Sequence, residues 1–352
     1  MRARTIDTVV NRHREGLYDD CQHDRHDTPG PRMNSQSVAP RSPSLSRRDA
    51  SARPFGRLLA FTEGRLWAYL LLLPSLLLLA AIIIYPIGSG ILLSFHEMRL
   101  TRADLGTPFI GLRHYRDLLT DDDVFRLALR NTVVWVAVGV VSQFLLGLVA
   151  ALALNRNVRG TGIFRLLMLI PWFLPSVVAG HMWALMLDSR LGVINDLLVR
   201  AGVLAQYQAW FVNPHTSLLA VSLVELWRSF PFFTLFLLAG IQAIPDDLYE
   251  AATTDGASMG QQFRFITVPL LMPVIVATVV LRVIGLVNGP DLLIVLTNGG
   301  PGNATQVLSL YAFQTAYTAF NFGYAAAISV VMLLLLMAFT VVYVRVSGAT
   351  KE

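Results

Sequence analysis

Six long apolar runs constrain this chain more than any other feature of its sequence. Each run exceeds the ~20 residues that an α-helix needs to cross ~30 Å of hydrocarbon at 1.5 Å per residue. Only 14% of the residues are charged, whereas soluble domains carry about 25%. We therefore expect an all-α polytopic membrane protein with six transmembrane helices. The runs cover residues 66–95, 131–154, 166–187, 216–244, about 265–297 and 322–344.

Arginine placement indicates which side of the membrane each loop faces. Arginines gather before the first run and in the short loop 155–165, whereas the loop 297–321 has none. Because cytoplasmic loops carry an excess of basic residues, both termini and the loop 244–268 are predicted to be cytoplasmic. Arginines in the loop 96–125 count against this orientation. The loops predicted to lie outside are 96–125, 188–215 and 298–321.

The two ends of the chain differ in composition from its middle. Residues 1–60 are rich in Arg, Asp, Ser, Pro and His, so they are predicted to be a disordered cytoplasmic tail, with Met33 as an alternative start. Residues 61–346 form the predicted transmembrane domain, and 347–352 a short cytoplasmic tail. Cys21 is the sole cysteine, which excludes an intrachain disulfide.

The sequence offers neither a nucleotide site nor a catalytic group. Lys351 is the sole lysine, so the chain cannot contain a phosphate-binding GxxxxGK[ST] loop. The histidines of the tail match no zinc-binding spacing, and no GxSxG motif occurs. We therefore expect a chain that is not an enzyme and that holds no cofactor or metal. The basic balance of a membrane protein likewise does not indicate nucleic-acid binding.

Residues 244–269 form a polar segment between two apolar runs, and their composition predicts a helix. Pro245 suits the first position of a helix, because its missing N–H needs no partner there. Asp246 and Asp247 then lie in the first turn, where the helix dipole favours negative charge. Ala251 and Ala252 give this helix a small face that permits close docking against another protein.

A turn and a second helix are predicted to follow. Gly256 can adopt the left-handed conformation that ends a helix, and Asp255-Gly256 is a turn signal. Ser258 and Gln261 have the spacing of a capping box. The second helix would run into the fifth span through Pro269.

The spacing of this segment resembles the EAA loop of permease subunits of binding-protein-dependent ABC importers. The matching residues are Glu250-Ala251-Ala252, Gly256, Ile266 and Pro269, with Val268 in place of the usual Leu. Further resemblance, over roughly residues 60–346, indicates the carbohydrate-importer branch and the maltose/glycerol-phosphate type of permease. It includes FIGLRHYRDLL at 109–119, ALRNTVV at 128–134, IPWFLPSVVAG at 170–180 and LTNGGPGNAT at 296–305.

This resemblance implies a type I ABC importer permease in a bacterial cytoplasmic (inner) membrane. The implied partners are a second homologous permease, two copies of an ATPase subunit that holds ATP and Mg, an extracytoplasmic solute-binding protein and a small carbohydrate. The loop 244–269 would be a coupling helix that docks on the ATPase. Its coupling residues would be Glu250, Ala251, Ala252, Asp255 and Gly256.

Charged residues inside the spans are costly and therefore need partners or a function. Glu225 and Arg228 are three residues apart, on one face of a helix, and are expected to pair. The pair either orients the fourth span or lines a substrate pathway. Arg282 in the fifth span has no local partner in the sequence, so we expect it to face an acidic group on another span or subunit.

The segment Asn288-Gly289-Pro290-Asp291 is predicted to break the fifth span. A broken helix frees backbone groups that can bind a ligand. Asn288 and Asp291 match the carbohydrate-importer pattern, whereas Pro290 replaces its aromatic residue. Asn288 and Asp291 are candidate ligand residues, with helix packing as the alternative. Trp172 could offer a sugar a stacking face or pack in the core.

Two other transport functions remain open from the sequence. One is an ion-driven secondary transporter, with Glu225, Arg228 and Asp291 as a relay. The other is an ABC importer for amino acids or peptides, which shares the EAA loop. The sequence does not name the sugar that a carbohydrate importer would carry.

Overall fold

The computed structural model describes residues 65–156 and 160–347, and within them the all-α prediction is confirmed. Apart from two isolated β-bridges, every element in these ranges is a helix. Among the described residues, five helices are long and apolar enough to cross a membrane, and a bent pair would supply a sixth span. The tail predicted for residues 1–60 and the end at 348–352 lie outside the described residues.

Five of the six predicted apolar runs correspond to long helices. The second helix, α6, begins before its apolar run because the Asp122 carboxylate caps it, accepting a hydrogen bond of 2.8 Å from the Phe125 amide. The long helices are α3 (Arg65–Leu79) continuing through η2 (Ala80–Ile84) into α4 (Tyr85–Leu93), α6 (Asp123–Leu154), α10 (Ser217–Gln242), α13 (Val268–Asn288) and α16 (Phe322–Val346).

The third apolar run, predicted as one transmembrane helix, is a bent pair of helices. It forms α7 (Thr161–Phe173) and α8 (Ser176–Met186), which meet at an angle of 95°. The break lies at Leu174 and Pro175, both in extended backbone conformation. Proline disfavours the helical conformation in the residue before it and lacks the N–H of a continuing helix, which favours a helix end at this position.

Shorter helices connect the spans. The predicted outer loop 298–321 contains one of them, α15 (Leu308–Tyr317), which sequence reasoning missed because the segment is too short to span a membrane. It packs against α6 and α16, which bury its apolar side chains. The other connecting helices are η3 (Leu100–Leu105), α5 (Arg113–Thr120), α9 (Val193–Arg200), α11 (Asp246–Thr254), α12 (Met259–Gln262), η4 (Phe263–Thr267) and α14 (Asp291–Leu296).

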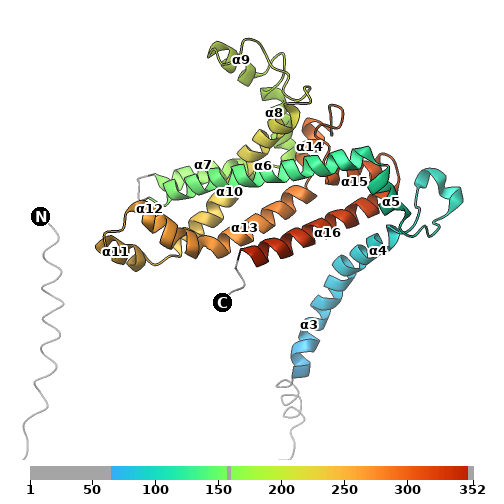
Figure 1. The fold of residues 1–352 in the computed structure, drawn as a ribbon, viewed down its shortest axis with the longest axis horizontal. Helices are drawn as coiled ribbons and strands as arrows, with labels where there is room; N and C mark the ends of the chain where they lie inside the picture. Colours follow the sequence, from blue (N-terminus) through green and yellow to red (C-terminus); the bar gives the residue numbers. More distant parts are fainter. Residues whose placement is uncertain (1–64, 157–159, 348–352) are drawn as a thin grey trace, which may run out of the picture. The chain divides into compact units, whose positions relative to one another are not determined.

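Helix α10 is the most buried of the described spans, and several other helices pack against it. It contacts α6, α7, α13 and α14, and Figure 1 shows α6, α10, α13 and α16 running side by side. More than half of its apolar stretch, 56%, is buried, against 0% for the described part of the first span. Gly147 on α6 lets α10 approach closely, because a Cβ there would lie 2.5 Å from the Cβ of Phe233.

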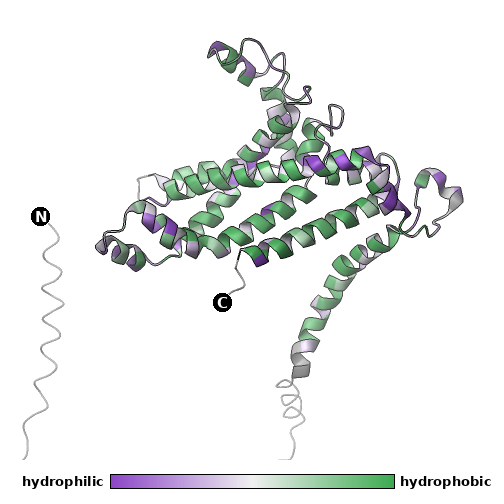
Figure 2. Ribbon diagram, in the orientation of Figure 1, coloured by the Kyte–Doolittle hydropathy of each residue, from purple (hydrophilic) through white to green (hydrophobic). Residues whose placement is uncertain are grey.

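The polar residues gather at the ends of the bundle. Figure 2 shows long hydrophobic stretches along the spans and hydrophilic residues around α11 and α12. Helices α11 and α12 lie at one end of the spans, while α14 and α15 lie at the other (Figure 1). The predicted coupling segment and the predicted ligand residues are therefore at opposite ends of the bundle.

Candidate functional site

The segment 244–269 folds as a helix, a turn and a helix that continues into α13, as its sequence predicts. Pro245 lies one residue before α11 as its N-cap, not at the first helical position that the sequence analysis gave it. Asp246 and Asp247 occupy the first turn of α11. Glu250, Ala251 and the turn after the helix are exposed, and Ala252 is half-buried. The segment therefore presents a small, partly acidic surface.

The turn after α11 is a complete helix-ending motif. Gly256 has φ +81°, and its amide donates to the Thr253 carbonyl over 3.0 Å. The Ala257 amide donates to the Ala252 carbonyl over 2.9 Å, and the pair of bonds satisfies the last carbonyls of the helix. Residues with a Cβ rarely adopt the left-handed conformation, so this turn favours glycine at position 256.

Two hydrogen bonds fasten α11 to the base of the fifth span. The hydroxyls of Tyr249 and Thr267 share a bond of 2.9 Å, and the Gln262 amide donates to the Thr253 hydroxyl over 3.0 Å. The predicted capping box is present, with the Ser258 amide donating to the Gln261 side chain over 2.7 Å. These bonds join α11 to α12 and η4, which continue into α13.

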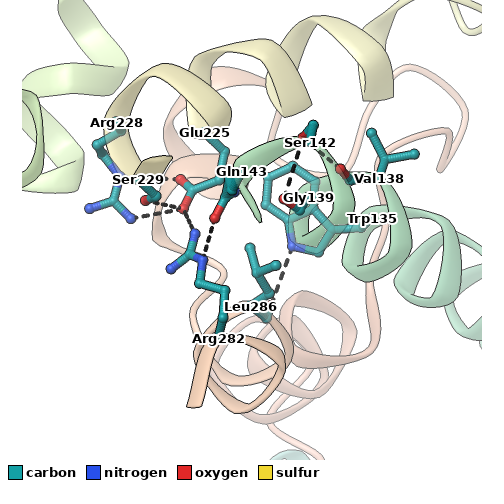
Figure 3. Close-up of polar contacts among 10 residues, drawn as sticks. All are labelled: Trp135, Val138, Gly139, Ser142, Gln143, Glu225, Arg228, Ser229, Arg282 and Leu286. Atoms are coloured by element: carbon teal, nitrogen blue, oxygen red, sulfur yellow. Dashed lines mark hydrogen bonds and ion pairs between the residues drawn. The ribbon is translucent and has the colours of Figure 1, made fainter. Parts of the chain in front are cut away.

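A buried ionic cluster joins three spans in the middle of the bundle (Figure 3). The Glu225 carboxylate on α10 accepts two hydrogen bonds of 3.1 Å from Arg228 and one of 2.8 Å from the Ser229 hydroxyl. Arg282 on α13 also donates to this carboxylate, and it donates to the Gln143 side chain on α6 over 2.5 Å. The expected pairing of Glu225 with Arg228 is present, and Arg282 faces an acidic group on another span.

Sequence reasoning missed Gln143 and Ser229 as members of this cluster. Gln143 was visible as a polar residue within an apolar run, but its partner could not be known before the helices were packed. Glu225 is 3% exposed, whereas the side chain of Arg228 is 21% exposed. Within the described residues, two guanidinium groups share this one carboxylate. The geometry thus supports an orienting role for Glu225.

The fifth span is broken where the sequence predicts. Helix α13 ends at Asn288 and α14 begins at Asp291, with Gly289 and Pro290 between them. The Asn288 amide donates back to the Ile284 carbonyl over 2.9 Å. Asn288 and Asp291 are both exposed, so they are available to a ligand or a partner chain.

Trp172 lies near the end of α7. Its ring is half-buried and packs against Phe173 and Phe232, with ring centres 5.5 and 6.2 Å apart. The structure therefore does not gather the sequence-predicted residues into one pocket. Glu225 and Arg228 bind each other, Asn288 and Asp291 flank the break, and Trp172 belongs to an aromatic cluster with α10.

The LTNGGPG loop is fastened at both of its ends. The hydroxyls of Thr297 and Thr305 share a hydrogen bond of 2.7 Å. The Asn131 amide on α6 donates to the carbonyls of Asn303 and Gln306, each over 3.0 Å. These bonds hold the loop and the start of α15 against α6, beside the broken span.

Comparison with known proteins places the chain among transport proteins. Residues 143–351 match the model of the family described as "Binding-protein-dependent transport system inner membrane component". The trehalose/maltose transport system permease protein of Thermococcus litoralis is 39% identical over 294 residues, which cover 84% of this chain and 97% of that protein. The sulfoquinovosyl glycerol transport system permease protein of Agrobacterium fabrum is 38% identical, covering 80% of this chain and 90% of that protein.

A solved structure shares the fold. A chain of a bacterial ABC transporter involved in the import of the acidic polysaccharide alginate superposes with a TM-score of 0.70. The two chains are 22% identical, and the match covers 84% of this chain and all 100% of the other. This likeness concerns the fold alone, since identity at this level does not carry the cargo across.

Proposed function

Because the chain belongs to the family of binding-protein-dependent transport system inner membrane components and has the type I ABC importer permease fold, we propose that it is the permease subunit of an ATP-driven sugar importer. The cargo would be a sugar or sugar derivative. Two relatives that are more than one-third identical carry the names of sugar permeases, which supports this class of cargo. The EAA-type spacing of residues 250–269 supports ATP as the source of energy.

The observation that carries the proposal is the exposed helix α11, which is hydrogen-bonded to the fifth span. Its Glu250, Ala251, Ala252, Asp255 and Gly256 would meet the ATPase subunit. Closure of the ATPase pair on ATP would move α11, and the bonds from Tyr249 and Gln262 would transmit the movement to α13. Hydrolysis in the ATPase subunits, which hold ATP and Mg, would reset the pathway.

Further subunits are needed to complete such an importer. A second homologous permease would supply the other half of the pathway, and the exposed first span supports contact with lipid or with that subunit. Two copies of the ATPase would dock on the cytoplasmic side, and a solute-binding protein would deliver the sugar from outside. The chain would lie in the bacterial inner membrane with both termini cytoplasmic.

The sugar would pass near the break in the fifth span, between α13 and α14. Asn288 and Asp291 are exposed there, so they are the proposed contacts with the cargo. Glu225 and Arg228 would hold the neighbouring spans in place, and Trp172 would pack beside the pathway. The burial and bonding of each side chain support these proposed roles.

Substitutions in α11 and its turn test the proposal. We expect Glu250→Lys and Gly256→Asp each to lower ATP-dependent sugar uptake by more than about fivefold, the scale of a coupling interaction, while the protein still inserts. The measurement is uptake into cells or vesicles, normalised to the amount of this chain in the membrane.

A matched control separates docking from backbone strain. Gly202 also has a positive φ, +72°, and like Gly256 it has open space around it, but it lies after α9. Gly202→Asp is expected to leave uptake near normal. Normal uptake by both the Glu250→Lys and Gly256→Asp variants, at normal protein levels, would contradict the proposed coupling role.

A further inference from the structure

A cavity adjoins the broken fifth span. It has a volume of about 370 Å³ and lies between α4, the end of α13, α15 and α16. Its size falls within the ~300–1,000 Å³ of small-molecule sites. The lining includes Asn288, Ser309, Phe313, Ala316, Tyr317 and Phe322. The candidate ligand residue Asn288 thus lines the same cavity as α15, which lies within the predicted outer loop 298–321.

Aromatic rings form one side of this cavity. Phe313 and Tyr317 are four residues apart on α15, so they share a helix face, and their ring centres are 4.9 Å apart. The Tyr317 ring also meets Phe322 edge-on, at 6.1 Å. Phe313 is 44% exposed and Tyr317 is 61% exposed, so both rings are accessible. Open aromatic faces of this kind suit the C–H faces of a sugar ring.

Polar groups complete the lining. The Asn288 amide N–H bonds to its own helix, and its carbonyl oxygen is left to accept a hydrogen bond from a ligand hydroxyl. Ser309 is 9% exposed, and its hydroxyl has no hydrogen-bond partner within the described residues. Buried hydroxyls normally have partners, which a ligand in this cavity could supply after rotation of the side chain.

We propose that this cavity holds one ring of the transported sugar, with Phe313 and Tyr317 as stacking faces and Asn288 as a hydrogen-bond partner. The proposal rests on the proposed sugar-import function and names the residues that select the cargo. Pro290 leaves the break itself without an aromatic face, and α15 places two rings beside the same asparagine. The small side chain of Ala316 leaves room between these rings and α16.

Cysteine protection tests the site in the complete importer. Cys21 is the sole cysteine, so Cys21→Ser gives a background in which Ala316→Cys or Ala319→Cys supplies one thiol. Ala316 lines the cavity, whereas Ala319 is exposed beyond the end of α15. A sugar that is taken up is first chosen from a panel of mono- and disaccharides. Each variant, assembled with its partner subunits, is then labelled with a maleimide in the presence and in the absence of a saturating concentration of this sugar.

The expected result is that sugar slows labelling of the Ala316→Cys thiol and leaves that of the Ala319→Cys thiol unchanged. Equal labelling of the Ala316→Cys thiol with and without a sugar that is taken up would overturn the site and leave the import function standing. Absence of ATP-dependent uptake of every sugar by the unmodified importer would overturn the import function, and the site with it.

A second pair of variants tests the aromatic face itself. Tyr317→Leu removes the ring, and we expect it to raise the KM for sugar uptake about three- to tenfold, the scale of one aromatic contact, without lowering the maximal rate. Tyr317→Phe keeps the ring and is expected to behave like the unmodified chain. An unchanged KM for Tyr317→Leu would contradict the stacking role, as would a loss of maximal rate shared by both variants.

Discussion

Glu225 pairs with two arginines, Arg228 and Arg282, within the spans. Its carboxylate accepts hydrogen bonds from Arg228 and Ser229 on its own helix and from Arg282 on α13. Charged groups inside a membrane protein are tolerated where they are paired. Removing the carboxylate would leave two guanidinium groups without the acceptor they share.

We expect Glu225→Gln to destabilise the protein by about 3–5 kcal/mol, as for other buried pairs that lose one partner. The measurement is unfolding of the purified protein in detergent. Asp196→Asn is the matched control, because the half-buried Asp196 pairs over 2.9 Å with Arg200, whose side chain is exposed, and pairs near the surface contribute about 0–1 kcal/mol. Equal stability of the two variants would contradict the bridging role of Glu225.

His114 is a second residue with a definable physical role. It lies on α5, outside the spans, where its Nε2–H donates to the His96 carbonyl over 3.2 Å and its ring meets Tyr324 edge-on. Burial lowers the pKa of His114 below 6.5. The hydrogen bond to His96 and the nearby carboxylates of Glu97 and Asp117 oppose this shift, whereas the positive charge of Arg99 adds to it. The folded protein therefore favours the neutral ring.

The sign of the pH effect follows from this lowered pKa. The folded state binds fewer protons than the unfolded state, so the stabilisation is present above the unfolded pKa and is lost as pH falls through the folded one. We expect the melting temperature of the unmodified protein to fall more between about pH 7.5 and pH 5.5 than that of His114→Gln. His215→Gln, at an exposed site, is the control and should keep the full pH dependence.

Among the elements, α10 and α6 show how one glycine sets the distance between two spans. A Cβ at Gly147 would approach the Cβ of Phe233 and would lie 3.1 Å from the Thr234 backbone nitrogen. Because backbone atoms cannot move aside easily, the two helices would have to separate. The close distance between α6 and α10 thus depends on the absence of a side chain at Gly147.

We expect Gly147→Ala to destabilise the protein by about 1–3 kcal/mol, the usual effect of overpacking a core. Gly162→Ala on α7 is the matched control, since nothing lies within 4 Å of the added Cβ and alanine favours helix. Thermal unfolding in detergent measures both. A Gly147→Ala variant as stable as the control would show that the helices do not depend on this close approach.

Local chemistry made part of the element structure predictable. The apolar runs predicted the spans, Ser258 and Gln261 predicted a cap, and Gly289-Pro290 predicted the break in the fifth span. Pro175 was visible in the third run, but the 95° bend depends on packing that the sequence does not display. Helix α15 was missed because only the surrounding helices α6 and α16 bury its short apolar face.

Contacts of the site between residues close in the sequence were predictable, whereas contacts between different helices were not. The pairing of Glu225 with Arg228 follows from helix spacing, whereas the link from Arg282 to Gln143 joins residues far apart in the sequence. The same limit hid the cavity that brings Asn288 beside Phe313 and Tyr317. Contacts across helices depend on the rotation of each helix about its axis, which periodicity alone did not fix.

At the scale of the whole molecule, the proposed sites of energy input and of cargo contact lie at opposite ends of the bundle. Helix α11 would receive movement from the ATPase, and α13 would carry it toward the break at Asn288. The buried cluster around Glu225 lies along the same spans and ties α6, α10 and α13 together. These spans would therefore move as one body.

The source of energy for uptake distinguishes an ATP-driven importer from a secondary transporter. Proteoliposomes that contain this chain with its partner permease, ATPase and binding protein are measured for sugar uptake, with ATP on the ATPase side or with an imposed ion gradient. We expect uptake that needs ATP and continues after ionophores collapse every ion gradient. Uptake driven by a proton or sodium gradient without ATP would contradict it and would indicate a secondary transporter.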